Sequence, residues 1–218
     1  MDARDLADLA DLPFAAALIS HQGGMAPSAE YDGVHFDQVS FDEPRAAGSR
    51  FIECAFTGVS FQGGGLQRSR FSDVWVRDGR LVTTSLARTQ WLDVVVDRSL
   101  AAGVEAFGAQ LRRVTFRGCK LDSVNFRETE FTEVTFDNCD LRDVDFAGAS
   151  LIRTAFPDSR LTRTDFSRVR MDKTDLRGAE LGIIIGPDSL RGAIISTGQL
   201  VQLAPVLAET MGVVVSDD

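Results

Sequence analysis

The chain has 218 residues and a formal net charge of −9 at pH 7. This acidity argues against non-specific nucleic-acid binding and leaves a basic protein as the kind of partner to expect. No apolar run approaches the ~20 residues of a membrane span, and no basic stretch followed by an apolar core opens the chain, so we expect a cytoplasmic protein without membrane contact.

Residues 1–28 form the first segment. Asp5, Asp8 and Asp11 recur every third position, each followed by a leucine, which predicts a short acidic amphipathic helix over residues 2–12. Pro13 ends or restarts this helix, the next seven residues favour helix, and a glycine-containing linker follows. We expect the segment either to cap the start of the next domain or to lie along its side.

The next domain is defined by a repeat of five. A large apolar residue occupies every fifth position from Phe116 to Leu181, and a small residue stands two positions before each. On a helix, residues five apart point in all directions around the axis, and on a flat strand they alternate between the two faces. They share one side only if the backbone turns a corner every five residues, which is a solenoid. Thirteen of the fifteen phenylalanines lie on this phase, which continues back to Tyr31 in less regular form.

The pattern small–x–Leu/Phe–x–x resembles the pentapeptide-repeat family. The resemblance implies an all-β fold, a right-handed quadrilateral parallel β-helix in which four five-residue sides make one coil. Residues 29–195 would form about eight coils, with short helical caps over residues 1–28 and 196–218. At ~4.8 Å per coil the rod would be ~35–40 Å long.

Two features inside the repeat leave alternatives open. Over residues 97–109, Ala101 and Ala106 replace the large inward residues, which predicts either a coil with a narrowed core or a loop that leaves the coil. Three cysteines occupy small inward positions: Cys54, Cys119 and Cys139. We expect buried reduced thiols, although the last two, one coil apart, have a spacing that a disulfide tolerates.

Twenty-residue spacing shows which outward residues stack. An apolar corner is expected from Ile52, Trp75, Leu92 and Val95. Exposed apolar patches mark contacts, so this corner predicts either a partner-binding surface or the place where the N-terminal leucines pack. Our interpretation favours the N-terminal segment.

Glu53, Asp73 and Asp93 also recur at twenty and predict a column of carboxylates ~5 Å apart. Such a column costs stability through repulsion, so it indicates either phosphate-like groups for a basic groove or a solvated face. Arg113 follows in the same column and limits the first interpretation.

After Leu181 the phase breaks. Leu200, Leu203 and Leu207 have helical spacing, interrupted by Pro205, which predicts a kink or two short helices. The family resemblance implies that such a segment pairs two rods into a homodimer; covering the last coil alone is the alternative.

No residue pattern indicates catalysis, a cofactor or a metal, so we expect no catalytic, cofactor-binding or metal-binding residues and a protein that is not an enzyme. The resemblance implies an acidic rod that mimics duplex DNA and binds a type II topoisomerase, DNA gyrase, modulating it or protecting it from quinolones or other poisons. The alternative function is a rigid scaffold that binds an unassigned protein through the Trp75/Leu92 corner. Supercoiling assays would separate the two.

Overall fold

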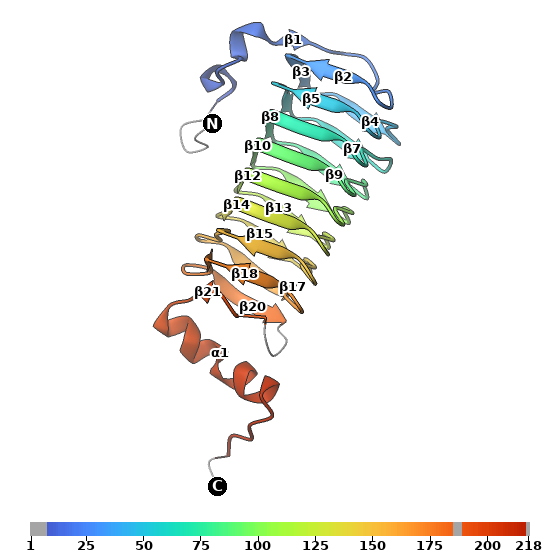
Figure 1. The fold of residues 1–218 in the computed structure, drawn as a ribbon. Coiled ribbons are helices and arrows are strands. Elements are labelled where there is room, and N and C mark those ends of the chain that lie inside the picture. Colours follow the sequence, from blue (N-terminus) through green and yellow to red (C-terminus); the bar gives the residue numbers. More distant parts are fainter. Residues whose placement is uncertain (1–7, 185–188, 217–218) are drawn as a thin grey trace.

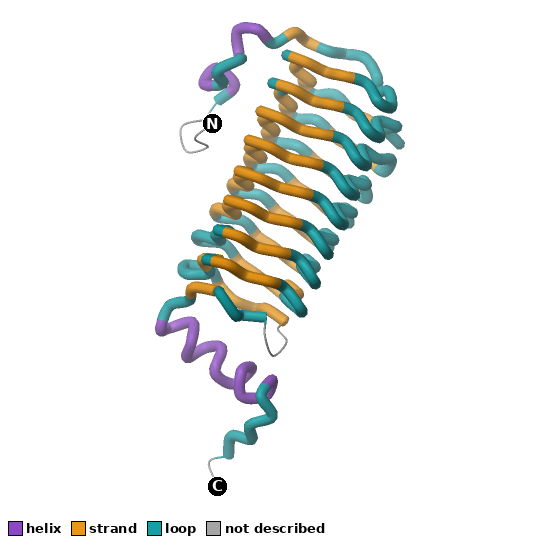
Figure 2. Tube along the Cα trace, in the orientation of Figure 1, coloured by secondary structure: helices purple, strands orange, loops and turns teal. Residues whose placement is uncertain are grey.

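The computed structural model describes residues 8–184 and 189–216 and shows a parallel β-solenoid of about eight coils (Figure 1). Except at the two ends of the rod, each strand pairs in parallel with strands twenty residues away, for example Phe71 with Phe51 and Trp91. The coil therefore has four sides of five residues. Figure 2 shows the strands stacked as parallel rungs along a straight rod, with helical turns at both ends.

Two sheets and a small third one cover the sides of the rod. The larger sheet contains β1 (Ile19–Ser20), β2 (Glu30–Asp32), β3 (Val34–Asp37), β5 (Arg50–Ile52), β6 (Ala55–Thr57), β8 (Arg70–Arg77), β10 (Gln90–Asp97), β12 (Gln110–Arg117), β14 (Glu130–Asp137), β16 (Ser150–Ile152) and β18 (Arg170–Asp172). The second contains β4 (Ser40–Asp42), β7 (Ser60–Gln62), β9 (Arg80–Val82), β11 (Leu100–Ala102), β13 (Lys120–Asp122), β15 (Asp140–Arg142), β17 (Arg160–Asp165) and β20 (Glu180–Ile184). The third pairs β19 (Thr174–Asp175) with β21 (Ala193–Ile194).

The five-spaced residues form the core, as predicted. Phe131, Phe136, Phe146 and Phe156 are fully buried, and rings one coil apart stack, with 5.0 Å between the centroids of Phe136 and Phe156. Burying an aromatic side chain and stacking it on its neighbour are both favourable, so every coil stabilises the next.

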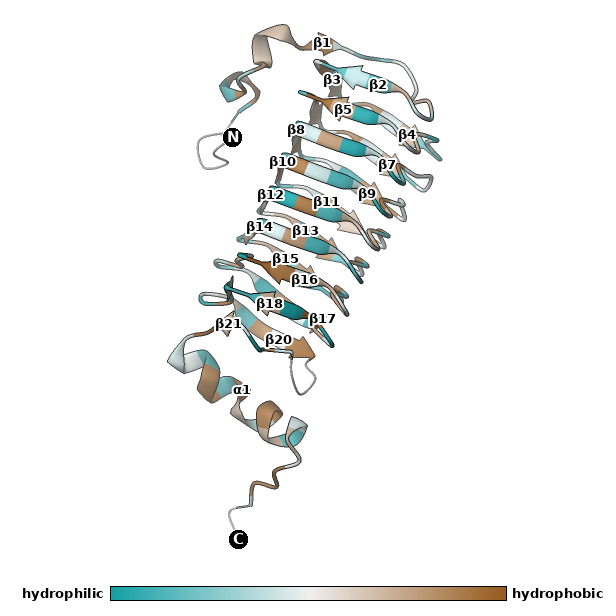
Figure 3. Cartoon of the chain, viewed as in Figure 1, coloured by the Kyte–Doolittle hydropathy of each residue, from teal (hydrophilic) through white to brown (hydrophobic). Residues whose placement is uncertain are grey.

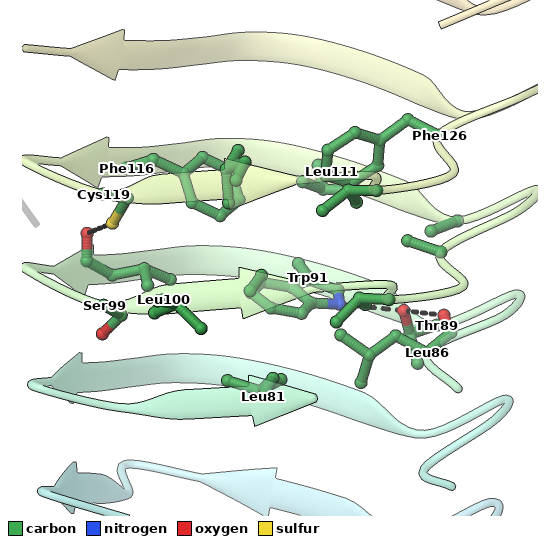
Figure 4. Close-up of a pocket in the computed structure, with 17 residues that line it drawn as sticks. Leu81, Leu86, Thr89, Trp91, Ser99, Leu100, Leu111, Phe116, Cys119 and Phe126 are labelled. Carbon is green, nitrogen blue, oxygen red and sulfur yellow. Dashed lines mark hydrogen bonds between the residues drawn. The ribbon is translucent and has the colours of Figure 1, made fainter. Parts of the chain in front are cut away.

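Residues 97–109 form a regular coil, so the loop alternative is wrong. β11 pairs with strands on both sides, and Glu105 bridges to Ser85 and Asn125. The backbone ladder does not depend on side-chain size, so alanine is tolerated at the cost of packing. A cavity of about 50 Å³ remains beside Ala101 and Ala106 (Figure 4).

All three cysteines are free and buried. Cys119 and Cys139 are neighbours on successive coils, and the backbone N–H of Cys119 donates to Sγ of Cys139 at 3.4 Å. Burial raises the pKa of the Cys54 thiol to about 11. The thiols therefore act as small inward side chains.

The N-terminal segment both caps the rod and lies along it. In the described residues the expected helices are two short 3-10 helices, Leu9–Asp11 and Ala15–Ala17; Asp5 and Leu6 lie outside the described residues. β1 then pairs with β3 and extends the large sheet by one edge strand. His21 covers the end of the core, with its ring 5.1 Å from that of Phe36.

The C-terminal segment is one helix, α1 (Thr197–Thr210), and it contains Pro205 without dividing into two. Its first turn closes the last coil. The side-chain amide of Gln199 donates to the carbonyl oxygens of Leu176 at 2.6 Å and Ala179 at 2.8 Å. Without Gln199 the Ala179 carbonyl would have no partner among the described residues, whereas the Leu176 carbonyl also accepts from the backbone N–H of Ala179 at 3.2 Å.

Candidate protein-binding surface

The acidic column lies along one corner of the rod. Glu53, Asp73 and Asp93 each have a positive φ, between 49° and 55°, because the chain turns the corner at this position. Their coils stack in strict twenty-residue register, so the three side chains leave the same edge of the rod. The structure thus places the predicted column on one corner.

The charge of this column is partly neutralised. Arg113, one coil further on, donates two hydrogen bonds to the carboxylate of Asp93, at 2.7 Å and 2.6 Å. These bonds lower the pKa of Asp93. Burial, and then the charge of Asp93, raise the pKa of Asp73. Of the three carboxylates in the column, Glu53 and Asp73 have no ion pair to a described residue.

The same arginine arrangement recurs along the rod. An arginine reaches the carboxylate twenty residues away in the pairs Asp78–Arg98, Asp97–Arg117, Glu133–Arg153, Asp143–Arg163 and Arg160–Glu180. Exposed pairs of this kind contribute little stability each, but they cancel the field of the carboxylates. Most of the rod surface is therefore electrically balanced.

The unbalanced charge lies at the N-terminal end. Residues 1–48 contain nine acidic and two basic side chains, a net charge of −7, whereas residues 49–218 contain 23 acidic and 21 basic ones, a net charge of −2. Within the first coil, Asp32, Asp37 and Asp42 follow three successive sides without an ion pair to a described residue. Since Glu30 pairs with Arg50 and Asp8 approaches Arg77, the carboxylates of the first coil that lack such a partner carry most of the negative charge among the described residues at this end of the rod.

The predicted apolar corner divides into two surfaces, because its residues leave the corner on different sides. Trp75 and Val95 lie at the start of one side and are 1% and 3% exposed, buried under the N-terminal segment. Ile52 and Leu92 lie at the end of the preceding side. The N-terminal segment covers Trp75 and Val95, which is the alternative that the sequence favoured, but it leaves Leu92 accessible, so the corner is not a single surface.

Leu92 remains accessible, 37% exposed, beside a surface groove of about 340 Å³. The groove is lined by Trp91 and by polar residues from neighbouring coils, among them Arg70, Arg112 and Glu130. A mixed lining of this kind suits a protein side chain better than a small cofactor.

The predicted capping leucines have different surroundings. Leu203 is buried and Leu207 half-buried, while Leu200 is 50% exposed. Gln199, which sequence reasoning missed, makes the polar contacts of the cap. Ser196 and Gln199 form a capping box, and that sequence pattern could have identified the start of the helix.

The described residues contain no group of three or more His, Cys, Asp or Glu side chains placed to hold a metal ion. In the same part of the chain, no helix has the length and apolarity to cross a membrane.

Comparison with known proteins shows which family the repeat resembles. Residues 109–183 match the family model described as a pentapeptide repeat region. No curated protein matches the chain. Among solved structures, HetL, a pentapeptide repeat protein involved in heterocyst differentiation regulation from the cyanobacterium Nostoc sp. strain PCC 7120, is 17% identical, with a TM-score of 0.46 over 81% of this chain and 93% of its own. QnrB1, a plasmid-mediated fluoroquinolone resistance protein, is 18% identical in its full-length form, with a TM-score of 0.30 over 89% and 100%. Residues 109–183 thus match the pentapeptide repeat, and the five-residue phase continues the same pattern back to Tyr31.

Proposed function

We propose that the chain is a non-enzymatic binding rod whose acidic N-terminal end engages a basic groove on a partner protein. The observation that supports this is the concentration of net charge, −7 in residues 1–48 against −2 in the rest. A field confined to one end steers and orients a basic partner there.

The partner that we propose is a type II topoisomerase such as DNA gyrase, because its DNA-binding surface must neutralise phosphates. The acidic end, extended by Glu53 and Asp73, would occupy that surface in place of DNA. In this proposal the likeness to DNA is limited to the N-terminal coils, since the arginine pairs balance the later ones. A protein that displaces DNA from the enzyme would modulate it and counter quinolones or other poisons that act on the DNA complex.

The test is supercoiling by purified gyrase over a range of salt concentrations, with and without a quinolone. We expect the chain to change supercoiling strongly at low salt and weakly at high salt. The double variant Asp37→Asn/Asp42→Asn, which removes from the acidic end two carboxylates without an ion pair to a described residue, should lose most of this effect. The matched control Glu133→Gln/Asp143→Asn removes the same charge from arginine-paired sites and should retain it. Equal loss in both, or a salt-independent effect, would refute the proposal.

A second candidate function is a scaffold that binds a protein through the Leu92 groove. The exposed leucine beside mixed polar residues favours it. In this case Leu92→Glu would abolish partner binding, and the acidic variants would have no effect.

We also propose that α1 and the residues after it join two rods into a homodimer. The segment carries exposed apolar side chains, including Val201 at 70% on α1 and Met211 at 76% just after it. Figure 3 shows hydrophobic residues alternating with polar ones along α1. Light scattering should give twice the chain mass, and Val201→Lys/Met211→Lys should return it to one.

A further inference from the structure

An outward-facing apolar strip runs across three coils beneath the N-terminal segment. Ala55, Trp75 and Val95 are register partners on β6, β8 and β10, and all three are buried. The next two residues of the same column are Thr115 and Thr135, as suits a solvated surface. The strip is therefore confined to the coils that the N-terminal segment covers.

The segment over this strip, residues 8–20, is called the strap below. Leu12 and Phe14 make the main contacts, and they form with the strip a small hydrophobic cluster separate from the core of the rod. The rod interior is thus complete without the strap, which covers only outward side chains.

Polar contacts hold the strap weakly. Asp8 approaches Arg77 at 3.5 Å, and the Asp8 side chain is 76% exposed. The strap's strand, β1, has only two residues. Hydrogen bonds from the backbone N–H groups of Ile19 and His21 join it to the rod. A segment with so few ordered contacts opens locally more readily than the coils do.

The strap also leaves one buried donor unsatisfied. The indole N–H of Trp75 is buried and has no acceptor among the described residues. Burying a donor without a partner costs free energy, and a different occupant that placed an oxygen at this point would avoid that cost. The strip is thus matched to the strap in shape but not in hydrogen bonding.

We propose that the Ala55–Trp75–Val95 strip is a docking site for an acidic amphipathic segment of a partner protein, and that the strap occupies this site as its intramolecular competitor. The chemistry of the strap defines the ligand: two or more large apolar side chains on one face for the strip, and a carboxylate for Arg77. Arg77 is well placed for this, since its guanidinium lies 5.8 Å from the centre of the Trp75 ring. This surface is distinct from the acidic end proposed above and does not depend on it.

The first test opens the strap in the full chain with Leu12→Asp/Phe14→Asp. The control, Ala10→Asp/Ala16→Asp, adds the same charge at exposed strap positions. A fluorescently labelled synthetic peptide of residues 8–20 is the probe, and its anisotropy measures binding. Acrylamide quenching of tryptophan fluorescence, in chains that carry Trp91→Phe, measures the exposure of Trp75. We expect acrylamide to quench the opened chain more strongly, and the opened chain to bind the peptide saturably. The control and the unmodified chain should bind no peptide. Adding Trp75→Ala to the opened chain should weaken peptide binding at least tenfold.

Three results would overturn the proposal. An opened chain that keeps its β-sheet circular dichroism but binds no peptide has no docking site. An opened chain that loses its β-sheet signal shows the strap to be part of the rod. A complex between opened and unmodified chains, formed by exchange of straps, assigns the site to a second copy instead of a partner protein.

A second test needs no variant. In native-state hydrogen exchange of the unmodified chain, the amides of Ile19 and His21 should exchange at least a hundredfold faster than those of Val94 and Val114 in the rod. Equal rates would mean that the strap opens only when the rod unfolds, which contradicts a displaceable strap.

Discussion

Filling the cavity beside Ala106 should stabilise the rod. Ala106 is 4% exposed and stands where the neighbouring coils have Leu86 and Phe126. The cavity beside it measures about 50 Å³. At ~24 cal/mol per Å³ of cavity, Ala106→Val should recover about 1 kcal/mol, and burying the added methyl groups contributes further, so we expect a gain of about 1–2 kcal/mol.

Urea unfolding followed by circular dichroism measures this gain as a higher midpoint at an unchanged slope. The control is Ala46→Val, in the same column but away from the cavities that line the coils around Trp91. Ala46 is fully buried, so an added side chain there overpacks the core and should cost about 1–3 kcal/mol. A loss of stability in Ala106→Val, or an equal gain in Ala46→Val, would show that the cavity does not limit stability.

Three further changes test other contacts. Arg113 lowers the pKa of Asp93, so their pair stabilises the fold above the ordinary carboxyl pKa, and this contribution disappears as pH falls through the lowered value. Arg113→Gln should therefore lower the urea midpoint slightly at neutral pH and leave it unchanged near pH ~2, where the Asp93 carboxyl is protonated. Gln199→Ala leaves the Ala179 carbonyl oxygen without a partner among the described residues, while the Leu176 carbonyl keeps its bond from the backbone N–H of Ala179. The change should cost about 1–3 kcal/mol, with faster hydrogen exchange confined to that coil. Thr83 holds a φ of 51°, unfavourable for a β-branched residue, so Thr83→Asn should gain about 0.5–1 kcal/mol; an unchanged melting temperature would contradict this.

The backbone could be predicted from the sequence because one period determines it. Once Phe116, Leu121 and Phe126 must share one interior, the corners, the twenty-residue register and the stacking columns follow. The regular coil at residues 97–109 shows how far this holds, since the phase there is kept although Ala101 provides little to bury.

The surface was less predictable because it depends on contacts between segments distant in sequence. Trp75 and Leu92 both point outward, but the corner between them sends one under the N-terminal segment and leaves the other exposed. The three-residue spacing of the N-terminal leucines indicated a helix. From residue 8 onward the structure shows two short 3-10 helices, Leu9–Asp11 and Ala15–Ala17, followed by strand β1 on the open edge of β3.

The electrostatics of the rod follow from the alternation of its coils. Residues 109–128 carry a net charge of +3, residues 129–148 carry −5 and residues 149–168 carry +2. Adjacent coils lie ~4.8 Å apart, well inside the Debye length of ~8 Å at physiological salt, so opposite rings attract each other and cancel at a distance. Duplex DNA presents the same sign along its whole length, and these coils cannot imitate that. The largest excess of one sign is in residues 1–48, with a net charge of −7, so this is where we propose that binding driven by charge begins.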